Sequence, residues 1–217
     1  IIDGVWEAGT ARTLEEIQQR FDISRTVARE ISAQLEATGL ATARRRRGLV
    51  AQPTGEWNSL HPLLIDWRLR SSQREQQIRT LTQLRLVVEP EAAEAAARNA
   101  DVYTRARLLP LAAEMRRTGE AGDLAEFLQR DVEFHSLILH ASGNELFAAM
   151  SGLVAVVLRG RTDLGLMPAQ PMPAALAGHE AVAEAIFRGE PEQARAAMQG
   201  ILAEVRDAFD DARPDGD

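Results

Sequence analysis

The sequence contains no cysteine, and all 25 of its basic residues are arginine rather than lysine. Without cysteine the chain can form neither disulfides nor a thiolate zinc site, and it has no cysteine nucleophile. The longest apolar run, Gly152 to Leu158, is far shorter than the roughly 20 residues that span a membrane. The start of the sequence shows no cleavable signal region. We therefore expect a protein of the bacterial cytoplasm.

The remaining composition is ordinary for a globular protein, with 217 residues of which 45% are apolar and 26% charged. This length suffices for one large or two modest domains. The formal net charge of −7 excludes a protein that is basic throughout. Residues 1–53 nevertheless contain eight arginines against seven acidic residues, whereas residues 54–217 contain 17 arginines against 25 acidic residues. The charge is therefore unevenly distributed along the chain.

The first part of the chain predicts two short helices joined by a tight turn. Thr13 and Glu16 have the spacing of a capping box at the start of the first helix. Ser24 caps the second helix, and Gly39 closes it. Apolar residues recur at helical spacing in both: Leu14, Ile17, Phe21, Val27, Ile31 and Leu35. Because IIDG resembles the last turn of a helix, we expect a further helix to precede it.

The segment LATARRRRGLVAQP then predicts two short strands around an arginine-rich turn, with Gly48 supplying a permissive backbone and Pro53 the stop. Two helices followed by a hairpin form a winged helix-turn-helix pattern over residues 1–53. Residues 54–62, rich in Pro, Gly and polar side chains, are interpreted as a linker.

Residues 63–217 predict an all-helical bundle of six to seven helices, so the fold class is mainly α. The helical period marks residues 62–71, 73–99, 101–119, 123–141, 144–164, 174–188 and 190–212. The segment GLMPAQPMP, with its three prolines, is expected to be a loop.

The segment LEEIQQRFDISRTVAREISAQLEATGLATARRRRGLV resembles the winged-helix domain of the GntR family of bacterial transcription regulators. Ser-Arg-Thr opens the second helix, an arginine follows one turn later, and Arg-Gly precedes an apolar strand. The resemblance implies that the second helix enters the major groove of operator DNA. The positions that match the family's DNA contacts are Arg25, Thr26, Arg29, Arg44, Arg45 and Gly48.

Physical arguments favour the same interpretation. The first turn of a recognition helix faces base edges, its free amides attract phosphate, and arginine pairs bidentately with guanine. The arginines at 44–47 could form a solvated hairpin tip, but beside a helix-turn-helix, contact with phosphate or the minor groove is the better interpretation. Glu15 is a departure, because family members often carry arginine there. Either this carboxylate points away from DNA or the protein docks differently from its relatives.

The stretch DVEFHSLILH, residues 131–140, places two ionisable side chains within an apolar helix face. On a 3.6-residue wheel His135 lies about 40° from Asp131. The apolar residues around them are Leu124, Phe127, Leu128, Phe134 and Ile138. His140 falls on the polar side of this helix and is interpreted as a surface residue.

Three further ionisable residues, His179, Arg85 and Arg161, lie on or at the edge of apolar helix faces, and Glu89 follows Arg85 by one turn. A lone histidine on such a face is usually a hydrogen-bonded core residue. Burying several unpaired charges costs several kcal/mol, so these groups should compensate one another or bind something. We therefore expect an effector pocket built from Arg85, Arg161, Asp131, His135 and His179.

The helical part also resembles the regulatory domain of the FadR branch of the GntR family, the FCD domain. The resemblance is carried by LRLVVEPEAAEAAA, DVEFHSLILHASGNELF and HEAVAEAIFRGEPEQARAAM. It implies an all-helical bundle that binds a small carboxylic acid and often a metal ion, and we further hypothesise that the protein is a homodimer. The words EWN, DW and LRLVVEP further resemble regulators of sugar-acid catabolism of the galactonate type.

Asp131, His135 and His179 are candidate metal ligands. The first two, spaced i and i+4, can reach one ion, and a carboxylate with imidazoles suits zinc, nickel, manganese or iron. Metal-binding relatives carry a further histidine where this chain has Ile201, which its wheel turns inward; Glu204 is a less suitable substitute. A three-ligand site therefore remains, with a metal-free pocket that binds an anionic effector directly as the alternative.

We hypothesise a dimeric transcription regulator, a repressor rather than an enzyme, that a small acid controls and that joins the nucleoid when bound to DNA. One alternative is a helical-bundle metalloenzyme with an Asp/His/His site, but no further base or nucleophile accompanies those residues. Another is an architectural DNA-binding protein without an effector, which would leave the buried polar cluster unexplained.

Overall fold

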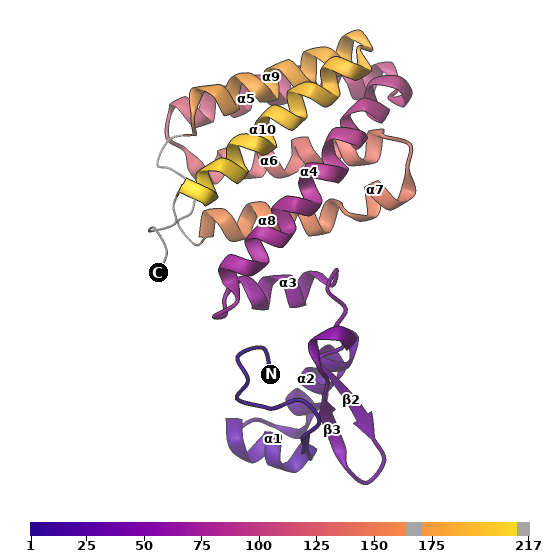
Figure 1. Ribbon diagram of the computed structural model, residues 1–217, viewed down its shortest axis with the longest axis vertical. Coiled ribbons are helices and arrows are strands. Elements are labelled where there is room, and N and C mark those ends of the chain that lie inside the picture. The colour runs from indigo at the N-terminus through magenta and orange to yellow at the C-terminus, as the bar shows by residue number, and fades with distance from the viewer. Residues whose placement is uncertain (164–170, 212–217) are drawn as a thin grey trace. The chain divides into compact units, whose positions relative to one another are not determined.

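The computed structural model describes residues 1–163 and 171–211, which are mainly helical and include one small sheet (Figure 1). The chain divides into two compact units, Ile1–Gln77 and Ile78–Asp217. The expected mainly α class is thereby confirmed. None of the described helices is long and apolar enough to cross a membrane.

The division between the units falls within a helix rather than in a loop. The functional boundaries that the sequence suggests, at residues 1–53, 54–62 and 63–217, remain a prediction. The segment interpreted as a linker packs on the first unit, because the Trp57 indole donates to the Gln52 carbonyl oxygen at 2.9 Å. Most of the proline-rich loop, from position 165 to 170, lies outside the described residues.

The first unit contains the two expected helices, a three-stranded sheet and a third helix. Its elements are β1 (Ala11–Arg12), α1 (Leu14–Phe21), α2 (Arg25–Ala37), β2 (Ala41–Arg44), β3 (Gly48–Ala51), the 3-10 turn η1 (Thr54–Glu56) and α3 (Pro62–Leu69). Its small core contains Ile17, Ala28, Ala41 and Leu49. Val27, which the helical spacing assigns to the same apolar set, is 40% exposed.

The caps of α1 and α2 follow from the sequence. The Thr13 hydroxyl accepts the Glu16 amide at 3.2 Å, and the Glu16 carboxylate accepts the Thr13 amide at 2.7 Å, so the expected capping box is confirmed. The Ser24 hydroxyl accepts the Val27 amide at 3.3 Å at the start of α2. These caps satisfy backbone amides at the starts of α1 and α2.

The sheet has one strand more than the two that the sequence predicts. β3 lies between β1 and β2 and pairs antiparallel with both. Gly48 begins β3 at a φ of +83°, and a Cβ there would lie 2.4 Å from the Arg12 carbonyl oxygen. Only glycine therefore allows β1 to approach this end of the hairpin.

The second unit is all helical in its described part. Its elements are α4 (Arg74–Asn99, which begins in the first unit), α5 (Val102–Glu120), α6 (Leu124–Ala141), α7 (Glu145–Ala149), α8 (Ser151–Asp163), α9 (Pro173–Arg188) and α10 (Pro191–Asp211). α9 packs against α10 and α5, α5 against α6, and α6 against α8. α4 runs obliquely to this series (Figure 1). The expectation of one helix over residues 144–164 is wrong, because the chain turns at Met150 between α7 and α8.

Candidate functional site

The expected recognition helix presents its polar side chains on an exposed face. Arg25, Thr26 and Arg29 are all exposed near the start of α2, whereas Ala28 between them is fully buried. Burial of Ala28 fixes which side of α2 packs inward, and the three polar side chains are left free to contact a partner. Arginine and threonine in the first turns of a capped helix can reach base edges and phosphates.

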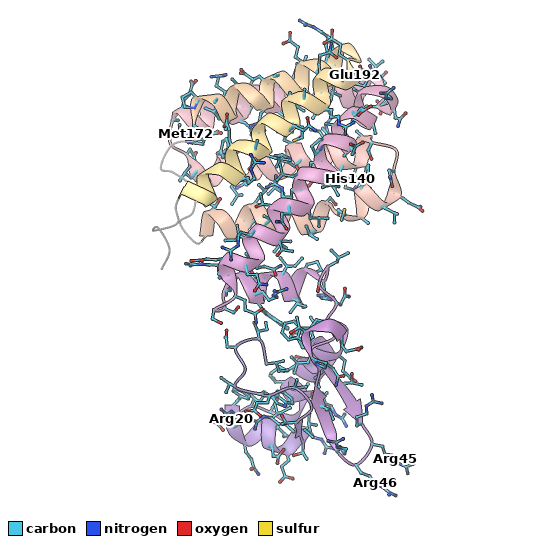
Figure 2. The ribbon with its side chains drawn as sticks, in the orientation of Figure 1. Arg20, Arg45, Arg46, His140, Met172 and Glu192 are labelled. Atoms are coloured by element: carbon cyan, nitrogen blue, oxygen red, sulfur yellow. The ribbon has the colours of Figure 1, made fainter. Side chains whose placement is uncertain are left out.

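The wing concentrates positive charge at one end of the sheet. All four arginines from Arg44 to Arg47 are exposed, and the Arg47 amide donates to the Arg44 carbonyl oxygen at 3.0 Å, which closes the turn. Figure 2 shows Arg45 and Arg46 at the tip of the hairpin. Gly48 follows this turn, and its close approach to Arg12 explains the glycine without any ligand.

Glu15 is exposed in the first turn of α1, and its carboxylate accepts from the Gln19 side chain at 3.4 Å. The carboxylate is thus turned along its own helix, toward the next turn. An acidic side chain at this helix terminus is favourable for α1 itself.

The candidate site of the second unit lies between α6 and α9. Asp131 and His135 lie one turn apart on the face of α6 that also buries Phe134 and Ile138. His179 lies on the face of α9 that buries Leu176, Val182 and Ile186. Helical spacing predicts this burial, and the structure confirms it. His140 is exposed, also as expected.

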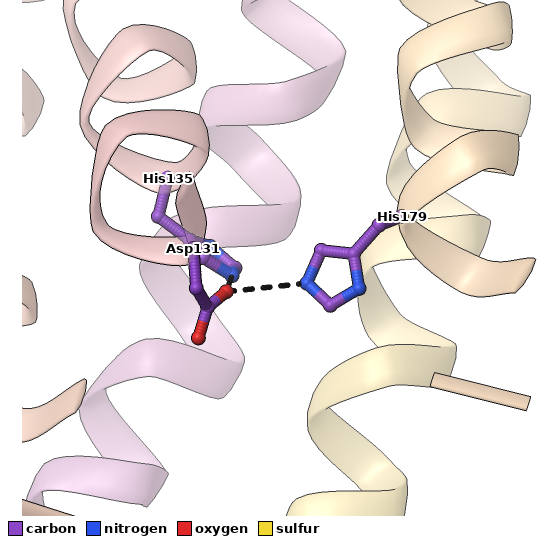
Figure 3. Close-up of side chains that lie close together, drawn as sticks. All are labelled: Asp131, His135 and His179. Atoms are coloured by element: carbon purple, nitrogen blue, oxygen red, sulfur yellow. Dashed lines mark ion pairs between the residues drawn. The ribbon is translucent and has the colours of Figure 1, made fainter. Parts of the chain in front are cut away.

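The three side chains converge on one point (Figure 3). The Asp131 Oδ1 atom lies 3.2 Å from His135 Nε2 and 3.4 Å from His179 Nε2. One ligand atom from each of the three side chains lies within 4.8 Å of the other two. Two ligands on one tetrahedral zinc ion, each at about 2.1 Å, are about 3.4 Å apart. The spacing therefore approaches that of a single coordination shell.

The far nitrogen of each imidazole lies against an oxygen atom. His179 Nδ1 lies 2.7 Å from the Ala175 carbonyl oxygen, and His135 Nδ1 contacts the Glu89 carboxylate of α4. With hydrogens on both Nδ1 atoms, the neutral rings turn Nε2 lone pairs toward Asp131 Oδ1, another acceptor. Asp131 Oδ1, His135 Nδ1 and His179 Nε2 have no hydrogen-bond partner in the described part of the chain, and His135 Nδ1 meets Glu89 as an ion-pair contact. Three acceptors that face one another require a positive charge between them.

The pKa shifts of Asp131 and His135 also indicate that the cluster needs a positive charge. Burial raises the pKa of Asp131, but the adjoining imidazoles of His135 and His179 outweigh this effect and hold the pKa well below its usual range. Burial lowers the pKa of His135, while Glu89 and Asp131 raise it to about 9. A proton on His135 therefore supplies the positive charge when no metal ion does.

Glu89 is the residue that the sequence interpretation did not assign to the site. It is 1% exposed and pairs with Arg85, whose Nη2 donates to Glu89 Oε2 at 3.3 Å. Burial raises the pKa of Glu89, but Arg85 and His135 lower it to about 2, so it is ionised. Its i+4 spacing from Arg85 on an inward face was the available signal.

The other predicted site residues are not among the three converging side chains. Arg85 is 3% exposed and pairs with Glu89, which in turn contacts His135 of the cluster. The side chain of Arg161 lies outside the described residues. Ile201 is buried, as its wheel predicts, and packs so closely on Gly178 that a Cβ there would lie 2.7 Å from Ile201 Cγ1. Glu204 is exposed, which excludes it from this arrangement of the site.

Comparison with known proteins identifies the second unit. The FCD domain model matches residues 80–204, more than half of the chain, and these residues contain all three candidate ligands. The chain belongs to the FCD-domain family. This is a family of transcription regulators, so the metalloenzyme alternative is not supported.

Relatives and a solved structure extend the comparison to the whole chain. The chain is 28% identical over 203 residues, covering 93% of it and 87% of the relative, to the uncharacterized HTH-type transcriptional regulator YieP of Escherichia coli. It is 27% identical over 207 residues, covering 94% of it and 89% of the relative, to the galactonate operon transcriptional repressor of the same organism. It shares the fold of Streptococcus agalactiae GntR, with a TM-score of 0.54, 22% identity and coverage of 93% and 91%. The protein thus has the architecture of a GntR-type regulator, a winged helix-turn-helix with an FCD domain.

Proposed function

We propose that the protein is a transcriptional repressor of the bacterial cytoplasm whose affinity for operator DNA is controlled by a small carboxylate or sugar acid. The observation that carries this proposal is the buried cluster of facing acceptors, Asp131, His135 and His179, inside the FCD domain of a chain that begins with a winged helix. The exposed arginines of the winged helix would contact DNA, and the buried cluster of the FCD domain would bind the small molecule.

DNA recognition is assigned to the exposed arginines of the first unit. Arg25, Thr26 and Arg29 would contact base edges and phosphates, and Arg44 and Arg45 the backbone beside them. Gly48 shapes the wing that carries these two arginines. Each good bidentate arginine–guanine pair is worth about 1–3 kcal/mol of discrimination between bases. Two copies of the chain, related by a two-fold axis, would read two half-sites of a palindrome.

The cluster fits a divalent metal ion. Two imidazole nitrogens and one carboxylate oxygen form a donor set that zinc, nickel, manganese and iron accept. Metal-bound histidines usually donate their other N–H to a carboxylate or a backbone carbonyl, and here His135 has the first kind of partner and His179 the second. A bound ion would supply positive charge that attracts the carboxylate of an effector.

Charge also indicates how an effector would bind. With neutral imidazoles, Arg85 and Glu89 cancel and Asp131 leaves one negative charge. A divalent ion makes the buried cluster +1, which one effector carboxylate neutralises. In a metal-free pocket, Arg85 would reach the effector only by exchanging the Glu89 carboxylate for that of the effector. Arg161 is retained as an effector ligand from the resemblance alone.

Effector binding would then shift the helical domain and change the spacing of the paired winged helices. Such couplings amount to about 1–3 kcal/mol, or about 5–150-fold in affinity. The galactonate operon repressor among the relatives makes galactonate the first acid to try.

The test combines metal analysis of the purified chain with a thermal-shift screen of galactonate, other sugar acids and small carboxylates. The proposal expects a divalent metal near one per chain and a rise in melting temperature with at least one acid. The matched variant His179→Ala should lose both responses, whereas His140→Ala, which changes an exposed histidine, should retain them. Equal responses in the two variants would place the acid elsewhere.

A further inference from the structure

The described helices carry three histidines, and one of them is held differently from the other two. His140 and His179 each place Nδ1 2.7 Å from the carbonyl oxygen four residues earlier, in Ser136 and Ala175. This is the nearest acceptor for a histidine on a helix. His135 instead directs Nδ1 at a carboxylate on another helix, that of Glu89 on α4.

Burying this ion pair costs free energy of folding. Both Glu89 and Arg85 are almost completely buried, and removing a carboxylate from water costs several kcal/mol unless other groups compensate it. Arg85 compensates the charge through its Nε and Nη2 atoms. A backbone carbonyl would accept from His135 without this desolvation cost. The use of a charged acceptor instead indicates that the His135 imidazole has a functional role.

We propose that Glu89 is a positioning residue of the metal site, which holds the Nδ1 hydrogen of His135 so that Nε2 presents its lone pair beside Asp131 Oδ1. This role rests on the proposed metal site. Glu89 is not itself a ligand, because it lies against the far nitrogen of the ring and outside the three-residue metal group. Arg85 keeps Glu89 ionised and in place.

The physical effect has two parts. An anionic acceptor at Nδ1 fixes the tautomer and the orientation of the ring, and it increases the electron density that Nε2 offers to a metal. His179 has only a neutral carbonyl acceptor. His135 is therefore the stronger imidazole ligand of the two, and its strength depends on a residue of α4 that never touches the ion.

The experiment uses the full chain, stripped with a chelator and titrated with Co²⁺, whose visible absorption reports the ligand field. Glu89→Gln keeps the shape of the side chain and removes its charge. We expect a loss of Co²⁺ affinity of about 10–100-fold, the usual effect of an outer-shell partner, together with a shifted visible spectrum. The matched control is Glu94→Gln, on the same helix, which breaks ion pairs with Arg98 and Arg195 outside the site.

The outcomes separate the inference from the metal site itself. Weakened binding and an altered spectrum in Glu89→Gln, with Glu94→Gln unchanged, support the positioning role. Binding like that of the wild type in Glu89→Gln, or equal losses in both variants, overturns it. A wild-type chain that does not bind Co²⁺ overturns the proposed metal site, and the role of Glu89 with it.

A single change at Glu89 leaves Arg85 buried without its partner, which can prevent folding. The double variant Arg85→Met, Glu89→Gln removes both charges and retains an amide oxygen near His135. Replacing a whole buried pair by uncharged residues of similar volume is often neutral for stability. This variant should fold and show the same weakened Co²⁺ binding, and unchanged binding would overturn the inference.

Discussion

Removal of the proposed metal ion is predicted to lower the melting temperature of the protein by an amount that depends on metal concentration. The buried acceptors of Asp131, His135 and His179 are close enough to bind one ion only in the folded chain. At free metal 100 times the dissociation constant, binding stabilises the fold by about 2.7 kcal/mol. At roughly 2–4 °C per kcal/mol for a chain of this size, the melting temperature rises by about 5–11 °C. Each further tenfold of metal adds about 1.4 kcal/mol.

The effect of metal on the melting temperature is also predicted to depend on pH. In the chelated protein burial lowers the pKa of His135, but Glu89 and Asp131 raise it to about 9, above its unfolded value of about 6.5. A histidine whose pKa is raised by folding stabilises the folded state at pH values below its unfolded pKa, and this stabilisation is lost as pH rises from about 6.5 to 9. The loss is on the order of 3 kcal/mol. Because the metal ion competes with the proton on His135, the rise in melting temperature that metal causes should become larger as pH increases from about 6.5 to 9.

The assay is thermal unfolding of the wild type with chelator or with Zn²⁺, at pH 6.5 and pH 8.5. His140→Ala, which changes an exposed histidine on the same helix, should retain the metal shift, and His179→Ala should lose most of it. The reasoning is refuted if the two variants respond alike, or if the metal shift is larger at the lower pH.

Three further predictions follow from the same structure. Replacing Arg25 and Arg29 together by alanine should lower the affinity for selected operator DNA by about 10–10³-fold or more, as measured by fluorescence anisotropy. The control Arg107→Ala, which removes an exposed arginine of the second unit, should not lower this affinity. Equal losses in the two variants would contradict the assignment of α2 as the recognition helix. Phe134→Ala should cost about 3–5 kcal/mol in urea unfolding, because this fully buried ring packs edge-on against both histidines; a cost below about 1 kcal/mol would contradict its place in the core. Ile201→His should tighten Zn²⁺ in a chelator competition by supplying a fourth ligand, and unchanged affinity would show that this position does not face the ion.

Local signals made much of the fold predictable. The capping box at Thr13 and Glu16 and the cap at Ser24 are properties of a few neighbouring residues, so their positions are given by the sequence alone. β1 was missed because a strand of two residues has no period of its own. It exists only through its pairing with β3, which Gly48 permits at the Arg12 carbonyl.

The candidate site was predictable in its faces but not in its contacts. Helical spacing was enough to turn Asp131, His135 and His179 inward. It could not show that Glu89, from a helix more than 40 positions earlier, meets the far nitrogen of His135, because the packing of α4 against α6 decides that contact. For the same reason Arg85 was expected at the effector, whereas the structure pairs it with Glu89.

The central claim is that an acid bound at the buried cluster controls the affinity for DNA. The direct measurement selects an operator fragment from random DNA and determines its dissociation constant with and without saturating galactonate, or another acid from the screen, in the wild type and in His179→Ala. The account predicts a change of about 5–150-fold in the wild type, none in the variant, and the same factor when the affinity for the acid is measured with and without DNA. Operator affinity that does not respond to an acid bound by the wild type, or that responds equally in His179→Ala, would contradict it.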